Sequence, residues 1–321
     1  MKKILFISSL AAVLAVSSCK KADFANSYTD PSKIAVSSVE KQFAGFVNSN
    51  LGYIMPGYWN YFVVQRITNN RYTQSVGWSN ATGQYIPGGG AVSDHWNSYY
   101  NFLSQYKELV KINKALSPAD QAERRIFMIA ATIYFYDYTQ KMVDVHGDIP
   151  WSAAGMLSAN GGDYLSSLPK YDKAQDIYTK MLDDLKAFST ELNTLTVPAA
   201  IQTAFNTQDF VLKGSKAAWT KYCNSLRLRM LTRVSGSSEL GARATSEIGA
   251  MIAAPDTYPL VNTNAETIQI NVFSTSTPVA GSNFQGGLED WNGNLASKAM
   301  IDHMNTNGDP RLPALFEPGT A

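Results

Sequence analysis

The chain has 321 residues, of which 45% are hydrophobic, so it can bury a sizeable core in one large helical unit or in two domains. Its 27 Lys and Arg residues almost balance 26 Asp and Glu residues, which excludes the strongly basic surface typical of nucleic-acid-binding proteins. Aromatic residues make up 12% of the sequence and charged residues only 17%. This composition favours stacking on neutral polar ligands over ionic recognition, although most of the rings are expected in the core.

The first 18 residues are predicted to be a lipoprotein signal peptide. A basic start at residues 1–3 precedes an apolar run over residues 4–16 that is too short to span a bilayer. The run leads through two serines to Cys19, which resembles a bacterial lipobox, where the cysteine thiol takes a diacylglyceryl group. An ordinary cleaved signal peptide with an incidental cysteine is the alternative.

Lipidation of Cys19 determines how the second cysteine is interpreted. Without Cys19 as a partner, Cys223 cannot form an internal disulfide, and it falls on the apolar face of a predicted helix. We therefore expect Cys223 to be a small, buried hydrophobic residue. Residues 19–30 are predicted to be a polar, lipidated tether, because acyl chains on Cys19 would hold the mature chain at a membrane surface.

Two amphipathic helices are predicted in the first half of the mature chain from apolar residues at 3.6-residue spacing. The first begins near Ser93 and Asp94, and its stripe consists of Trp96, Tyr99, Tyr100, Leu103, Tyr106 and Val110. The second has Ser117 as its N-cap and runs to Val143, with apolar residues around most of its circumference, which indicates packing on several sides. Gly147 is expected to end it.

Two further helices follow by the same spacing. The third is predicted to open at Asp172, with Gln175 three residues later as a variant of the capping box. The fourth has Ser215 as its cap and an apolar stripe of Trp219, Tyr222, Cys223, Leu226, Met230 and Val234. Arg227 of this helix is expected to form an ion pair with Asp137 or Asp144.

The segments between the helices are predicted to be long and irregular. Residues 68–92, 150–170 and 255–296 are rich in Gly, Asn, Ser and Thr, and loops of this length commonly serve binding. Alternating apolar and polar residues over 266–274 predict one short strand. The predicted fold class is therefore mainly α, with long irregular loops and little β.

Aromatic residues outside the helix stripes are the predicted ligand-binding residues. The C–H face of a sugar ring stacks on Trp or Tyr, while amide side chains bond the hydroxyl groups. The candidates are Tyr58, Trp59, Trp78, Tyr85 and Trp291, with Asn60, Asn80 and Gln84 close by in the sequence. Trp96 and Trp219 lie on helix stripes and are assigned to the core.

The sequence predicts no cofactor, no metal site and no catalytic site. His146 lies between Asp144 and Asp148, but a helix C-terminus with a single imidazole explains this cluster without a metal. Residues 305–310 carry oxygen ligands for Ca²⁺, yet they lack the regular alternation of a known loop, and a plain turn is favoured. Motifs of nucleophilic hydrolases, zinc proteases and phosphate-binding loops are absent, so an enzyme is not expected.

Three sequence blocks resemble one protein family. They are YFYDYTQKMVDVHGDIPW at 134–151, PKYD at 169–172 with IYTKMLDDL after it, and WTKYCNSLRLRMLTR at 219–233. Together with the tail DPRL at 309–312 and the lipobox, they resemble the SusD/RagB nutrient-binding lipoproteins of Bacteroidetes. The order and spacing of the blocks extend the resemblance over nearly the whole chain.

The resemblance implies a helix-pair scaffold similar to tetratricopeptide repeats, here over residues 31–321, with relatives continuing beyond the point where this chain ends. It implies capture of an oligosaccharide or peptide and delivery to a TonB-dependent SusC-like transporter, from the outer face of the outer membrane. The aromatic residues of the loops would then contact either the ligand or the transporter. Lys20 and Lys21 replace the acidic residues associated with surface export, which leaves the membrane face open. The alternative is an adaptor lipoprotein that binds a protein partner through its helical groove.

Overall fold

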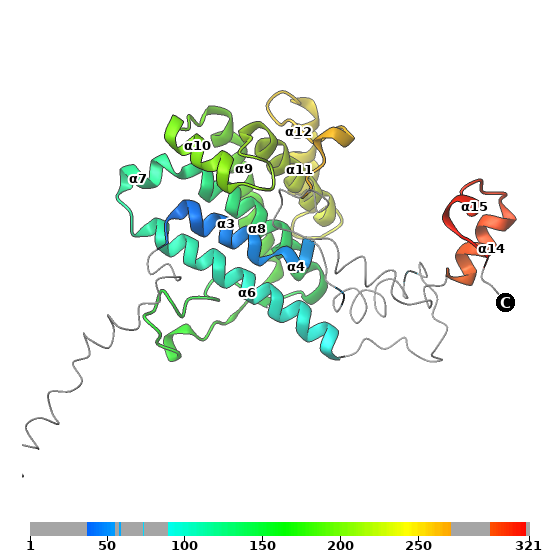
Figure 1. The fold of residues 1–321 in the computed structure, drawn as a ribbon, viewed down its shortest axis with the longest axis horizontal. Coiled ribbons are helices and arrows are strands. Elements are labelled where there is room, and N and C mark those ends of the chain that lie inside the picture. Colours follow the sequence, from blue (N-terminus) through cyan, green and yellow to red (C-terminus); the bar gives the residue numbers. More distant parts are fainter. Residues whose placement is uncertain (1–36, 55–57, 59–72, 74–88, 271–295, 319–321) are drawn as a thin grey trace, which may run out of the picture. The chain divides into compact units, whose positions relative to one another are not determined.

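The computed structural model describes residues 37–54, 58, 73, 89–270 and 296–318. Its strands are β1 (Ile149–Pro150) and β2 (Tyr171–Asp172), and two 3₁₀ turns lie at Leu165–Ser167 and Asn264–Glu266. The helices, labelled in Figure 1, are α3 (Val39–Ser49), α4 (Leu51–Ile54), α6 (Gly89–Lys114), α7 (Pro118–Glu123), α8 (Arg125–His146), α9 (Ala174–Thr194), α10 (Ala199–Gln208), α11 (Lys216–Val234), α12 (Gly241–Ala253), α14 (Lys298–Thr306) and α15 (Leu312–Leu315).

The predicted mainly α class is confirmed. In the described residues, β structure is confined to one antiparallel pairing, in which Ile149 faces Asp172 and Pro150 faces Tyr171. Segments 151–170 and 255–263, which lie within stretches that were expected to be irregular, contain no α-helix. Within the same described residues, no helix is long and apolar enough to cross a membrane.

Helix α8 is the centre of the core. Every residue from Ile126 to Tyr136 is buried, as the apolar circumference of this segment predicts. The helix packs against α3, α6, α9 and α11, which surround it in Figure 1. Full burial of each large apolar side chain stabilises the fold by about 2 kcal/mol, so α8 anchors the packing of its neighbours.

Aromatic rings join α6 and α3 to α8. The ring of Phe46 stacks on Phe102 with centroids 4.5 Å apart, and Tyr106 stacks on Phe135 at 4.3 Å. The predicted stripe of α6 is confirmed, since Tyr99 and Leu103 are buried and its other members pack against the core. The helix begins at Gly89, earlier than predicted.

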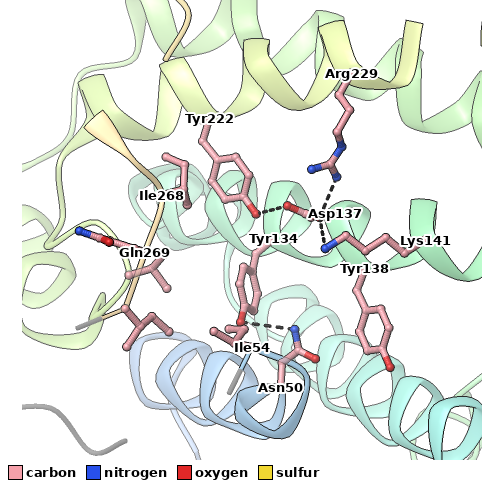
Figure 2. Close-up of a pocket in the computed structure, with 12 residues that line it drawn as sticks. Asn50, Ile54, Tyr134, Asp137, Tyr138, Lys141, Tyr222, Arg229, Ile268 and Gln269 are labelled. Carbon is pink, nitrogen blue, oxygen red and sulfur yellow. Dashed lines mark hydrogen bonds and ion pairs between the residues drawn. The ribbon is translucent and has the colours of Figure 1, made fainter. Parts of the chain in front are cut away.

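The arginines of α11 face different helices. Arg227 pairs with Glu247 of α12 at 2.6 Å, so the expected pair with Asp137 or Asp144 was wrong. Those two carboxylates instead pair with Arg229 at 2.7 Å and Arg233 at 3.0 Å, as Figure 2 shows for Asp137. The reason is helical geometry, because a shift of two positions rotates a side chain by about 200° around the helix.

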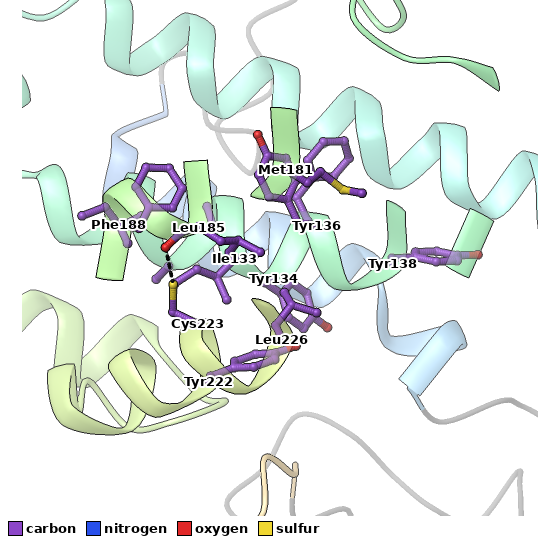
Figure 3. Close-up of a cluster of buried hydrophobic side chains, with 14 of the residues drawn as sticks. Ile133, Tyr134, Tyr136, Tyr138, Met181, Leu185, Phe188, Tyr222, Cys223 and Leu226 are labelled. Atoms are coloured by element: carbon purple, nitrogen blue, oxygen red, sulfur yellow. Dashed lines mark hydrogen bonds between the residues drawn. The ribbon is translucent and has the colours of Figure 1, made fainter. Parts of the chain in front are cut away.

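The interface of α8, α9 and α11 contains Cys223 (Figure 3). Its thiol is fully buried among apolar side chains and donates to the carbonyl of Leu185 at 3.4 Å. Burial raises the pKa of this thiol to about 12, which keeps it protonated. The prediction of a small buried hydrophobic residue is confirmed. On the same helix, the predicted cap is also confirmed, because the Ser215 hydroxyl accepts from the amide of Ala218.

The second predicted helix is two helices. Ser117 caps α7 as expected, accepting from the amide of Asp120 at 3.2 Å, but α7 ends at Glu123. None of the α7 residues is buried, so no core packing keeps α7 and α8 together as one continuous helix. Arg124 breaks the helix at φ −88° and ψ 11°, and its guanidinium bonds Glu40 of α3 at 2.8 Å.

Asp172 does not cap α9, in contrast to the prediction. It lies in β2, where its carboxylate accepts from the backbone amides of Trp151 and Ser152, both at 2.9 Å. Helix α9 begins two residues later at Ala174, and the amide of Ala174 donates to the carboxylate of Asp148 at 2.9 Å. A carboxylate from the loop after α8 thus caps α9.

The strand predicted over residues 266–274 is not present in its described part. Residues 264–266 form a 3₁₀ turn and residues 267–270 have no regular structure, while the remainder lies outside the described residues. Sequence analysis also missed α3, α10, α12 and α14. In α3 the stripe Val39, Phe43, Phe46 and Val47 has the helical spacing and is buried.

A buried charge cluster holds α12 to α11. The side chain of Arg227 is only 2% exposed, and Glu247 accepts from Arg227 at 2.6 Å and from Arg243 at 3.0 Å, with Lys186 at 3.6 Å. The guanidinium of Arg227 also lies over the ring of Tyr258, 5.5 Å from its centroid. Three cations therefore share the carboxylate of Glu247, and Arg243 also pairs with Asp183 at 2.7 Å.

Glu247→Leu is expected to lower the free energy of unfolding by about 3 kcal/mol, because it leaves the buried charge of Arg227 without its carboxylate. Urea unfolding followed by circular dichroism measures the change. The double variant Arg227→Met with Glu247→Leu should recover much of the loss, since it removes both charges. A double variant less stable than the single one would contradict this explanation.

Candidate functional site

A cavity of about 500 Å³ opens where α8 and α11 meet the end of α3, α4 and residues 268–270. Figure 2 shows its labelled side chains converging from these elements. The lining residues are Asn50, Ile54, Tyr134, Asp137, Tyr138, Lys141, Val211, Tyr222, Arg229, Ile268, Gln269 and Ile270. The volume lies in the range of small-molecule sites, which is about 300–1,000 Å³.

Asp137 is the polar centre of the cavity. Its carboxylate accepts from the hydroxyl of Tyr222 at 2.6 Å and from the guanidinium of Arg229 at 2.7 Å, and the ammonium of Lys141 is 3.5 Å away. Burial acts to raise the pKa of Asp137, but the two cations and the hydrogen bonds outweigh it and lower that pKa below its ordinary value. Asp137 is therefore ionised at neutral pH.

Tyrosine rings form the walls beside this carboxylate. Tyr134 and Tyr138 come from α8 and Tyr222 from α11, and the amide of Asn50 donates to the Tyr134 hydroxyl at 3.4 Å. Burial and the adjacent Asp137 raise the pKa of Tyr222 well above its ordinary value, so its hydroxyl remains a donor. The cavity thus combines aromatic faces with hydroxyl, amide and carboxylate groups.

The same pattern repeats along α8. Asp144, seven residues after Asp137, accepts from the Tyr178 hydroxyl at 2.5 Å and pairs with Arg233 at 3.0 Å. Between these two levels, Gln140 accepts from Arg229 at 2.9 Å. We call this set the Tyr-Asp-Arg ladder, made of Tyr222, Asp137 and Arg229 at one level and Tyr178, Asp144 and Arg233 at the other.

A second cavity of about 570 Å³ adjoins the ladder. It shares Arg229 with the first cavity and also borders Arg233. Its other lining residues are Ser225, Leu228, Thr232, Leu260 and Val261. The side of α11 that carries the two ladder arginines therefore faces both cavities.

Most sequence-predicted binding residues lie outside the described residues, so their role stays a prediction. This applies to Trp59, Asn60, Trp78, Asn80, Gln84, Tyr85 and Trp291, and to the lipidation site Cys19. Tyr58 is described, is exposed and does not line either cavity. Trp219 is buried in the core as assigned, with its indole N–H donating to Asp209, and Trp96 is partly buried against the core.

The residues weighed as metal ligands have other partners. A single imidazole was expected at this position, but His146 has a second one beside it. The Nδ1 atom of His95 in α6 lies 3.4 Å from the Nε2 atom of His146. Burial lowers the pKa of both imidazoles, and for His95 the neighbouring His146 adds to the effect. The predicted turn after α14 is confirmed, with Gly308 at φ +57° and the carboxylate of Asp309 held by Arg311. Across the described ranges, no group of three or more His, Cys, Asp or Glu is placed to hold a metal ion.

The helix spacing contained a signal for the cavity that sequence analysis did not use. Asp137, Lys141 and Asp144 occupy positions i, i+4 and i+7 of a helix that is mostly apolar, so they share one face. Polar residues on one face of a buried helix indicate a polar partner or a site at that face. Arg229 and Arg233, four positions apart, are the matching pair on α11.

A family model described as starch-binding and associating with the outer membrane matches residues 39–321. The chain belongs to this SusD-like family. Similar solved structures include a chitin-binding protein, at 25% identity and a TM-score of 0.64, covering 86% of this chain and 55% of that one. A chitin-binding SusD homologue from Flavobacterium johnsoniae matches at 20% identity and a TM-score of 0.61, covering 84% and 53%.

A SusD-like protein from Bacteroides thetaiotaomicron has the same fold, at 18% identity and a TM-score of 0.59, covering 88% of this chain and 54% of its own. The chain thus spans about half the length of these solved SusD-like proteins. No curated protein matches it. The description of the matching family model names starch binding and association with the outer membrane.

The lowered pKa of Asp137 predicts a pH-dependent contribution to stability. A carboxyl with a lowered folded-state pKa stabilises the fold fully above its unfolded value of about 4, and this contribution is lost as the pH falls through the folded-state value. The stability advantage of wild type over Asp137→Asn should therefore be largest at neutral pH and shrink below about pH 4. Urea unfolding across this range measures the difference. Asp256→Asn, at an exposed position, is the control, and an advantage that does not change with pH would contradict the prediction.

Proposed function

We propose that this protein captures nutrient saccharides at the outer membrane and passes them to a TonB-dependent SusC-like transporter without changing them chemically. The match of the family model over residues 39–321 carries the proposal. The cavity beside α8 supports it, because aromatic faces next to hydroxyl, amide and carboxylate groups suit the C–H faces and hydroxyl edges of sugar rings. Loop residues such as Trp59 and Trp78 remain additional candidates.

The loop between β1 and β2 supports a contact with a partner protein. Leu157, Tyr164, Leu165 and Leu168 of this loop are exposed, as is Tyr171 at the start of β2. Hydrogen bonds hold this loop, including Asn160 to the carbonyl of Ser166 at 3.2 Å and Lys111 of α6 to Ser158 at 2.7 Å. Exposed apolar residues on a fixed loop are typical of an interaction site, and we assign this one to the transporter.

Filling the cavity is expected to block saccharide binding. Ile54 lines the cavity and is 37% exposed, so the larger ring of Ile54→Trp occupies space that a ligand would use. Titration calorimetry with malto- and chito-oligosaccharides should give an affinity at least about tenfold weaker, which corresponds to about 1.4 kcal/mol.

Ile252→Trp is the matched control, because Ile252 is exposed on α12 and borders neither cavity. Unchanged affinity of Ile54→Trp, together with loss of binding in Trp78→Ala, would move the site to the loop aromatics. Heat with a protein partner and with no saccharide would favour the adaptor function instead.

We also propose that Cys19 is lipidated and holds the protein at the exterior face of the outer membrane. Cys19→Ala removes the thiol that would take the diacylglyceryl group. The variant should lose fatty-acid labelling and leave the membrane fraction, because two or more acyl chains are needed for stable anchoring. Surface proteolysis of intact cells reports which face carries the protein. A wild-type protein without fatty acid in the soluble fraction would refute the anchor.

A further inference from the structure

The charges around the main cavity are arranged in two layers. The carboxylates of Asp137 and Asp144 lie inward, with side chains 18% and 19% exposed. Their cationic partners lie outward, with side-chain exposures of 46% for Lys141, 45% for Arg229 and 61% for Arg233. A ligand that approaches from solvent therefore meets the cations before it meets the carboxylates.

The tyrosines strengthen this arrangement from the inner side. Tyr222 and Tyr178 donate their hydroxyl protons to Asp137 and Asp144, so each carboxylate is bonded on its buried side as well as by an arginine. Each carboxylate keeps part of its acceptor capacity, but these bonds hold it on the inner side of the cations.

Cations outnumber anions among the described residues that line the main cavity. Among the lining residues that the structure describes, Lys141 and Arg229 are cations and Asp137 is an anion. The adjoining cavity shares Arg229 and adds Arg233, whose charge is balanced by the inward Asp144. Charges of one sign at the mouth of a cleft attract ligands of the opposite sign.

We propose that the saccharide bound in this cavity is acidic, with a carboxylate or sulfate group facing Lys141, Arg229 and Arg233. The inference rests on the proposed function and specifies its substrate class. The anionic group would lie at the outward cations, while the sugar ring would lie against the tyrosine walls near Asn50. The overall composition, with few charged residues, favours neutral ligands and does not predict this preference.

The test compares saccharides of equal length that differ in charge. Titration calorimetry measures the affinity of the whole chain for a tetrasaccharide of galacturonate, for maltotetraose and for chitotetraose. At low salt, we expect the acidic tetrasaccharide to bind at least about tenfold more tightly than the two neutral ones. This preference should decrease at about 1 M salt, where the screening length is about 3 Å.

Lys141→Gln is expected to weaken binding of the acidic tetrasaccharide about three- to tenfold and to leave binding of neutral ones nearly unchanged. Lys180→Gln is the matched control. Lys180 also forms an ion pair with an aspartate four positions away on its helix and is 58% exposed, but it lines neither cavity. Arg233→Gln provides a second variant, with the expectation of a similar loss.

The outcomes separate the two proposals. Equal affinity for acidic and neutral ligands, or an equal effect of Lys141→Gln and Lys180→Gln, would overturn the acidic preference and leave saccharide capture intact. Binding of the neutral ligands without binding of the acidic one would also overturn the acidic preference and leave saccharide capture intact. Absence of binding to any saccharide, in a folded wild-type chain, would overturn both the preference and the proposed function.

Discussion

Two carboxylates on α8, those of Asp137 and Asp144, constrain the arrangement of the helices around it. Both residues lie on a helix whose other residues mostly face apolar neighbours, and each carboxylate has a cation and a tyrosine hydroxyl as close partners. Arg229 and Arg233 of α11 provide two of these partners, and Tyr178 of α9 provides a third. Because the partners come from two helices, the bonds fix the rotation and register of α8 against both.

The cavity follows from this constraint. The bonds that neutralise Asp137 also hold the ring of Tyr222 and place the arginine of α11 at the rim. The same groups thus serve the fold and the candidate site, since an ion pair of this kind contributes more to register than to net stability. Any ligand in the cavity meets groups already fixed by packing, which lowers the entropic cost of binding.

Helices with strong apolar periodicity could be predicted from the sequence, and so could the cap at Ser215 and the burial of Cys223. The partners of Arg227, Asp172 and Asp148 could not, because local spacing does not specify which distant group a polar side chain meets. Arg124 shows a related limit, since its contact with Glu40 lies 84 residues away in the chain. The sequence showed a polar face on α8, but the cavity also requires α4 and residues 268–270.

The cap on α9 has a consequence for how the chain folds. Asp148 bonds the first amide of α9 across 26 residues, and Asp172 bonds Trp151 across 21. Contacts between residues this close along the chain lose little loop-closure entropy when they form. The unit of α8, its following loop and α9 can therefore assemble early, whereas α3 and α11 join it through contacts of longer range, which form more slowly.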